Sequence, residues 1–322
     1  MWAGFFAIVL VMLAIDLFVG GCKEHRVSFK EAATWSGIWV GVSFAFAGAL
    51  WWYLDGEMGR ALANQKVLEY ITGYLIEKSL AVDNVFVWMM IFSFFAIPIQ
   101  MQKRVLILGV LGAIVMRTAM IFAGVWLIAQ FHWLLYVFGA FLLITGIKMW
   151  WFADEKPDLN NNPAVNWLRR HMKVTQELHG ERFFVMKEKA GKWVRYATPL
   201  FLVLILVEIS DLIFAVDSIP AIFAITTDPF IVLTSNIFAI LGLRAMYFLL
   251  ADMGDRFSLL KYGLAIVLMF IGVKMMLIDL FKIPVLFSLG VVAAIIATSV
   301  ALSLRNETRQ RRTATRPDAE KR

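Results

Sequence analysis

The chain has 322 residues, of which 61% are hydrophobic, including 27 Phe and 12 Trp, and its formal net charge is +7. This composition is far more apolar than that of an ordinary soluble protein and indicates an all-α polytopic membrane protein. The basic residues gather in loops and in the tail beside apolar runs, as orientation signals do in membrane proteins, so nucleic-acid binding is not expected.

Apolar stretches of about 20 residues, bounded by charges, Gly or Pro, predict nine transmembrane helices. We expect them over residues 2–21, 32–54, 67–96, 104–130, 132–152, 197–224, 230–251, 258–280 and 284–304. Helices one to five thus occupy residues 1–152, and helices six to nine occupy residues 197–304. The polar loop 153–196 alternates around a Gly-containing turn, which predicts a β-hairpin. The Arg-rich residues 305–322 are expected to form a disordered basic tail on anionic lipid.

The distribution of Lys and Arg predicts the orientation of the chain. With the N-terminus outside, most basic residues fall in the connections and the tail on the cytoplasmic side. We therefore expect a multi-pass protein of the plasma membrane, the inner membrane of a bacterium, with a cytoplasmic C-terminus and a cytoplasmic 153–196 loop.

Two segments of the chain repeat each other, at about 67–152 and 197–280. The matched residues are Glu77 with Asp211, Asp83 with Asp217, Asn84 with Ser218, Arg117 with Arg244, and Lys148 with Lys274. Each unit holds three predicted helices, and an odd number makes the copies enter the membrane from opposite sides. The sequence therefore predicts an inverted repeat, an architecture typical of secondary transporters with a substrate site between the halves.

The repeated motifs place acidic residues inside apolar helices. Each ionisable group at membrane depth costs about 2.5 to 3.5 kcal/mol, so a duplicated set indicates a polar site. Carboxylate, amide and hydroxyl oxygens suit magnesium, calcium or manganese rather than copper or zinc, and no Cys or His is near. The candidate metal ligands are Glu77, Asp83, Asn84, Glu208, Asp211, Asp217 and Ser218. Pro220 is expected to break the sixth helix and free the carbonyl of Val216 as another ligand.

Basic residues within the predicted helices give the acids a second interpretation. Arg117, Arg244 and Lys78 are expected to be structural counter-charges, and the acids could serve only to neutralise them and hold the bundle together. The single cysteine, Cys22, excludes an intrachain disulfide. The chain contains no HExxH, GxSxG or P-loop motif, so we expect neither an enzyme nor a permanently bound cofactor.

Four stretches of the chain resemble the TerC family of integral membrane proteins, and two of them its Alx-like branch. They are residues 77–85, Glu208-Ile-Ser-Asp211 with its continuation to Ala221, Tyr196-Ala-Thr-Pro199, and Ala239 to Phe248. The resemblance covers about residues 1–304 and implies metal-ion transport, above all manganese export. It implies that the acidic positions of the family fall on Glu77, Asp83, Glu208, Asp211 and Asp217. It leaves the ion open, because members are also linked to calcium handling and to supplying metal for exported enzymes.

These observations lead to one leading expectation and one alternative. The leading expectation is a secondary transporter that exports divalent cations, with Mn(II) as the substrate ion, the lipid bilayer as a partner and protons as the coupling ion. The alternative is a membrane scaffold that supplies metal to exported enzymes or aids membrane-protein assembly through the 153–196 loop. Calcium is the alternative ion.

Overall fold

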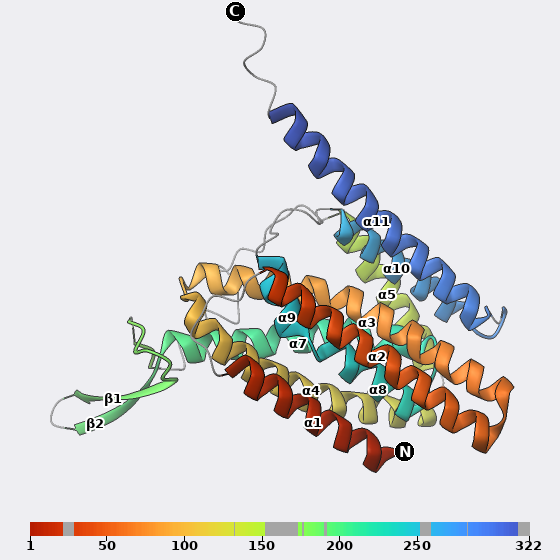
Figure 1. Ribbon diagram of the computed structural model, residues 1–322, viewed down its shortest axis with the longest axis horizontal. Coiled ribbons are helices and arrows are strands. Elements are labelled where there is room, and N and C mark those ends of the chain that lie inside the picture. The colour runs from red at the N-terminus through yellow and green to blue at the C-terminus, as the bar shows by residue number, and fades with distance from the viewer. Residues whose placement is uncertain are drawn as a thin grey trace, which may run out of the picture.

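The computed structural model describes residues 1–21, 29–131, 133–151, 173–175, 177–189, 192–251, 259–281 and 283–314. Figure 1 shows a bundle of long helices with a small hairpin projecting from one end. The helices are α1 (Trp2–Gly21), α2 (Phe29–Met58), α3 (Arg60–Phe94), α4 (Ile99–Gln130), α5 (Leu134–Trp151), α7 (Pro199–Phe223), α8 (Pro229–Ile240), α9 (Leu243–Ala251), α10 (Leu260–Met276) and α11 (Val285–Ala314). The strands β1 (Phe184–Lys189) and β2 (Lys192–Ala197) pair antiparallel.

The predicted all-α membrane architecture is confirmed. Among the described residues, six stretches are long and apolar enough to cross a bilayer: Phe29–Met58, Ile99–Gln130, Leu134–Trp151, Pro199–Phe223, Pro229–Ala251 and Leu286–Ser303. A shorter apolar run, Trp2–Asp16, lies in α1. The count of nine membrane-spanning helices stays a prediction.

The helix predicted over residues 230–251 is divided into α8 and α9. The chain turns at Leu241 and Gly242, where Gly242 adopts a φ of +87° that disfavours any side chain. A Cβ on Gly242 would also lie 2.8 Å from Cγ of Trp39. The turn therefore requires glycine twice over, for its backbone angle and for the close approach of α2.

The break expected at Pro220 is wrong. Helix α7 continues through Pro220 and ends at Phe223. Proline removes the hydrogen bond to the carbonyl of Val216 but, this close to the end of the helix, leaves the rest of the ladder intact. The interruption in the second unit thus lies one helix later than the sequence suggested.

Helix α8 forms the centre of the bundle. In the 18-residue apolar window of Pro229–Ala251, 94% of the residues are buried, whereas 22% are buried in Leu134–Trp151 of α5. Its start is well defined, because Pro229 occupies the first turn and the Asp228 side chain accepts a hydrogen bond from the Phe230 amide at 3.0 Å. Helices α3, α4 and α2 pack around it.

Helices α5 and α10, the third helices of the two repeats, reveal the symmetry between the units. A Cβ on Gly146 would lie 2.8 Å from the carbonyl oxygen of Ala265, and one on Gly272 would lie 2.8 Å from that of Gly139. Gly146 and Gly272 are equivalent in the repeat, and so are Gly139 and Ala265, by the alignment that pairs Lys148 with Lys274.

Gly146 of α5 thus meets the carbonyl oxygen of Ala265 in α10, and its equivalent Gly272 of α10 meets the carbonyl oxygen of Gly139 in α5. The two contacts are the same contact made in both directions. Gly146, late in α5, lies by Ala265, early in α10, whereas Gly139, early in α5, lies by Gly272, late in α10. The two helices therefore run antiparallel. This is the geometry of an isologous contact about a local twofold axis. This contact is the one that the predicted inverted repeat would give, and the repeat of whole three-helix units stays a prediction.

The structure describes parts of the predicted loop, residues 153–196, and of the predicted tail, residues 305–322. The β1–β2 hairpin lies within the predicted loop, and residues 152–172, 176, 190 and 191 are outside the described part. Helix α11 extends to Ala314, so disorder is wrong for residues 305–314. That stretch contains no Gly or Pro and has four Arg together with one Glu, one Gln and one Ala, all of which favour helix. Residues 315–322 are outside the described part.

Candidate ion site

A buried arginine in the first repeat joins carboxylates from both units. Arg117 lies on α4 with a side chain 1% exposed, and its guanidinium forms an ion pair with Glu77 of α3. Its Nε donates to Oδ2 of Asp211 on α7 at 3.1 Å, and its Nη2 donates to Oδ1 of the same carboxylate at 2.8 Å. A bidentate arginine–carboxylate pair of this kind fixes both side chains in direction as well as distance.

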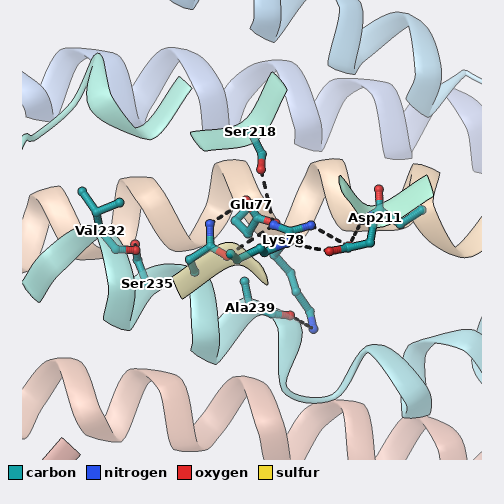
Figure 2. Close-up of polar contacts among 10 residues, drawn as sticks. Glu77, Lys78, Asp211, Ser218, Val232, Ser235 and Ala239 are labelled. Carbon is teal, nitrogen blue, oxygen red and sulfur yellow. Dashed lines mark hydrogen bonds and ion pairs between the residues drawn. The ribbon is translucent and has the colours of Figure 1, made fainter. Parts of the chain in front are cut away.

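Two further polar side chains complete the surroundings of the guanidinium. Nη1 of Arg117 donates to Oγ of Ser218 and to Oδ1 of Asn236, each at 3.3 Å. Asn236, on α8, in turn donates from Nδ2 to Oε2 of Glu77 at 3.2 Å. Figure 2 shows these contacts converging between Glu77, Ser218 and Asp211. We call Arg117, Glu77, Asp211, Ser218 and Asn236 the arginine cluster.

Asn236 was not among the residues predicted from the sequence. It follows Thr234 and Ser235 in an otherwise apolar stretch, and all three are fully buried. The two hydroxyls donate to backbone carbonyls of their own helix, whereas Asn236 reaches across to α3 and α4. A run of three polar residues inside a membrane helix was the signal that could have identified it.

Beside Asp211, two buried oxygens have no hydrogen-bond partner. Asn84 donates from Nδ2 to Oδ1 of Asp211 at 3.2 Å, but its own Oδ1 is unpartnered. Glu208 precedes Asp211 by one helical turn and presses against Gly112 of α4, and its Oε2 is also unpartnered. Buried acceptors normally find a donor, so either oxygen can coordinate a cation, and the Glu208 carboxylate can also take up a proton.

The other predicted counter-charges lie outside the arginine cluster. Nζ of Lys78 donates to the carbonyl of Ala239 at 3.3 Å, in the last turn of α8 before the break at Gly242. This bond satisfies one of the carbonyls that a helix end leaves free. Arg244 forms an ion pair with Asp16 of α1, at 2.9 Å. Of the three predicted counter-charges, Arg117 is the one paired with the predicted ligands.

The second pair of repeated acids has a different position. Asp217 lies on α7, half-buried, and is hydrogen-bonded by Thr145 of α5 rather than by Arg117. The backbone of Asp83 lies within α3, but its side chain is outside the described part of the structure.

Six of the seven predicted ligands have described side chains, and these six do not form one coordination shell in this conformation. Within the described part of the chain, no three Asp, Glu, His or Cys residues are close enough together to hold a metal ion. Glu77 and Asp211 are both occupied by Arg117. The structure thus brings three of the predicted residues, Glu77, Asp211 and Ser218, into contact with one guanidinium; Asn84 bonds to Asp211, and Glu208 lies one helical turn before Asp211 on α7.

Comparison with known proteins identifies the family. A family model described as integral membrane protein TerC family matches residues 62–311. The chain belongs to the TerC family. It is 59% identical over 305 residues to a Photorhabdus laumondii protein and 58% identical over 304 residues to an Escherichia coli K12 protein, each named "Putative membrane-bound redox modulator Alx". Both alignments cover 94% of this chain and 94% of the relative.

More distant relatives extend over the same length. An uncharacterized membrane protein of Myxococcus xanthus is 49% identical over 304 residues, covering 94% of this chain and 92% of that protein. No solved structure matches the chain. The TerC family assignment confirms the resemblance seen in the sequence and supports a multi-pass integral membrane protein.

Proposed function

We propose that this TerC protein is a secondary transporter that exports divalent metal cations, with Mn(II) as its substrate. The observation that carries the proposal is the meeting of Glu77 and Asp211, repeat-equivalent acids from two inverted units, in one buried cluster. A substrate site between inverted repeats is what alternating access requires.

The chemistry of the side chains favours a hard cation. Glu77, Asp211, Glu208 and Asn84 offer carboxylate and amide oxygens, the ligands that manganese and calcium prefer. We propose manganese first because the TerC resemblance implies manganese export, and calcium as the alternative. Asp83 and Asp217, the second pair of repeated acids, are proposed to line the path of the ion.

Export needs an energy source. Moving a divalent cation out against an inside-negative potential costs about 4.6 kcal/mol per 100 mV, twice the figure for one charge. The chain has no P-loop, so we propose proton exchange, in which a carboxylate that binds metal in one state binds a proton in the other. The proposed orientation, in a bacterial inner membrane, places the N-terminus outside and the 153–196 loop and C-terminus in the cytoplasm.

The test is Mn(II) flux in proteoliposomes that contain the purified protein, followed with a fluorescent metal indicator. We expect flux well above that of protein-free liposomes, driven by an imposed proton gradient at clamped membrane potential, and greater with Mn(II) than with Ca(II) as the transported ion. Flux equal to that of protein-free liposomes would contradict the proposed function. Flux that ignores the proton gradient would contradict the coupling alone.

The projecting hairpin favours a second candidate function, a membrane scaffold. In Figure 1 β1 and β2 extend away from the helical bundle. The hairpin exposes the apolar side chains of Trp193 and Met186, which are 68% and 56% exposed. Exposed aromatic and Met side chains are common at protein contacts. Replacing residues 184–197 with a short Gly-Ser linker should preserve Mn(II) flux in a transporter and abolish function in a scaffold.

The name of the Alx relatives suggests a redox role, and the chain limits how such a role could work. Its single cysteine, Cys22, cannot form an intrachain disulfide. A transporter of a redox-active metal could influence redox balance without any thiol of its own, which agrees with the proposed manganese export.

A further inference from the structure

Arg117 lies where a transported cation would be expected to bind. Its guanidinium contacts a carboxylate of the first unit, Glu77, and a carboxylate of the second, Asp211. It is also held by a hydroxyl and an amide oxygen, from Ser218 and Asn236. Carboxylate, hydroxyl and amide oxygens are the same kinds of ligand that a hard metal ion prefers. The arginine side chain is thus surrounded as a bound cation would be.

Arg117 and a divalent ion cannot share these oxygens. A guanidinium is always charged and has donors but no acceptor, so it can neither lose its charge nor coordinate a metal. Both cations would face each other at short range in a site with little water, where like charges repel strongly. An ion that binds Glu77 and Asp211 must therefore displace Arg117.

Oxygens next to the arginine cluster are ready for another cation. Oδ1 of Asn84 and Oε2 of Glu208 are buried and have no hydrogen-bond partner. Asn84 bonds to Asp211 through its Nδ2, and Glu208 lies one helical turn before Asp211 on α7. An arginine that served only to neutralise the bundle would not account for acceptors left without a donor. With Arg117 displaced, the freed carboxylates of Glu77 and Asp211 would be the first ligands of an ion, and the side chains of Asn84 and Glu208 would have only a short way to move to join them.

The equivalent arginine of the other unit, Arg244, has different partners. Arg244 is bound by Asp16, which lies on α1 outside both repeats, and it takes no ligand from the arginine cluster. Arg117 has no such acid of its own and instead holds the acids of the two units together.

We propose that Arg117 is a displaceable internal cation that occupies the ion site between transport events and competes with the substrate for Glu77 and Asp211. This inference rests on the proposed function. The guanidinium keeps the carboxylates neutralised after the ion leaves, so the empty site can change its accessibility without carrying bare charges through the membrane. The metal ion and the arginine side chain bind the carboxylates of Glu77 and Asp211 in turn.

The experiment measures Mn(II) affinity by calorimetry in detergent for the full chain and for Arg117→Ala, Arg117→Lys and the matched control Arg244→Ala. If Arg117 occupies the site for about nine-tenths of the time, its removal should raise the apparent affinity about tenfold. Arg117→Lys, which keeps the charge but not the fixed fork of donors, should bind with intermediate affinity. Arg244→Ala should bind like the wild type.

A second measurement separates competition from a merely structural role. Guanidinium ion at low millimolar concentration should compete with Mn(II) in Arg117→Ala and leave wild-type binding unchanged. Wild-type or weaker Mn(II) affinity in folded Arg117→Ala would overturn the inference. If that variant does not fold, an affinity of Arg117→Lys no higher than wild type overturns it. Either result leaves the proposed function standing while the wild type carries flux; absence of wild-type flux would overturn both.

Discussion

The arginine cluster depends on one amide that faces two charged groups. Asn236 accepts from Arg117 through Oδ1 and donates to Glu77 through Nδ2, so each end of the amide has a defined partner. This arrangement sets the orientation of the Glu77 carboxylate in a place without water to replace a lost bond. A buried partner left unsatisfied costs about 1–3 kcal/mol, more for a charged one.

Replacing Asn236 with Leu should therefore lower stability by at least about 1–3 kcal/mol and weaken Mn(II) binding, because Oε2 of Glu77 loses its donor while Arg117 still binds the other carboxylate oxygen. The matched control is Ser235→Ala, since Ser235 is equally buried on the same helix but donates only to the Val232 carbonyl. Melting in detergent and calorimetric titration provide the readouts. Equal behaviour of the two variants would show that Asn236 is not specifically required.

Among the elements, the junction of α8 and α9 is the feature most sensitive to a single side chain. Lys78 binds the Ala239 carbonyl just before the junction, and Lys78 follows Glu77 in α3. The ion site and the end of α8 are thus attached to adjacent residues of one rigid helix. A movement of Glu77 on ion binding would be carried directly to the junction.

Gly242→Ala should destabilise the protein by at least about 1–2 kcal/mol, the cost of a left-handed angle for a residue with a Cβ, with an added overlap against Trp39. Gly48→Ala in α2 is the control, because a Cβ there meets nothing within 4 Å. The melting temperature of Gly242→Ala should therefore lie clearly below that of Gly48→Ala. A Gly242→Ala protein as stable as Gly48→Ala would show that the turn tolerates another conformation.

Across the whole molecule, the α5–α10 contact relates the two units. Gly146 and Gly272 each meet backbone atoms of the opposite helix, and backbone atoms cannot move aside as a flexible side chain can. The two helices are therefore locked at their closest approach. We infer that this pair stays together while the remaining helices of the units change their arrangement.

The local twofold axis predicts that Gly146→Ala and Gly272→Ala have similar effects. Each substitution adds a methyl group against a backbone carbonyl and a backbone amide of the facing helix, and these atoms are equivalent in the two repeats. Overpacking of this kind costs about 1–3 kcal/mol. Gly290→Ala in α11 meets nothing within 4 Å and should be nearly neutral. Melting temperatures that fall by very different amounts for Gly146→Ala and Gly272→Ala would contradict the symmetry.

The sequence predicted the helices and the repeat because both leave local signals. Apolar runs locate the described helices, although α3 begins at Arg60 rather than at residue 67 and α11 ends at Ala314 rather than at residue 304, and Glu77 with Asp211 marks the two units. The turn at Gly242 was missed because a single glycine in an apolar run is also tolerated inside a helix. The pairing of Arg117 with Asp211, which are 94 residues apart, depends on tertiary packing that no local pattern contains.

An ion site shared by the two units is tested most directly by Mn(II) flux in proteoliposomes. The variants to compare are Glu77→Gln and Asp211→Asn, with Asp55→Asn as the control. Asp55 pairs with Arg60 at the exposed α2–α3 junction and has no part in the cluster. At matched amounts of folded protein, we predict that both cluster variants lose most of the flux and that Asp55→Asn keeps it. Flux retained in either cluster variant would contradict an ion site shared by the two inverted units.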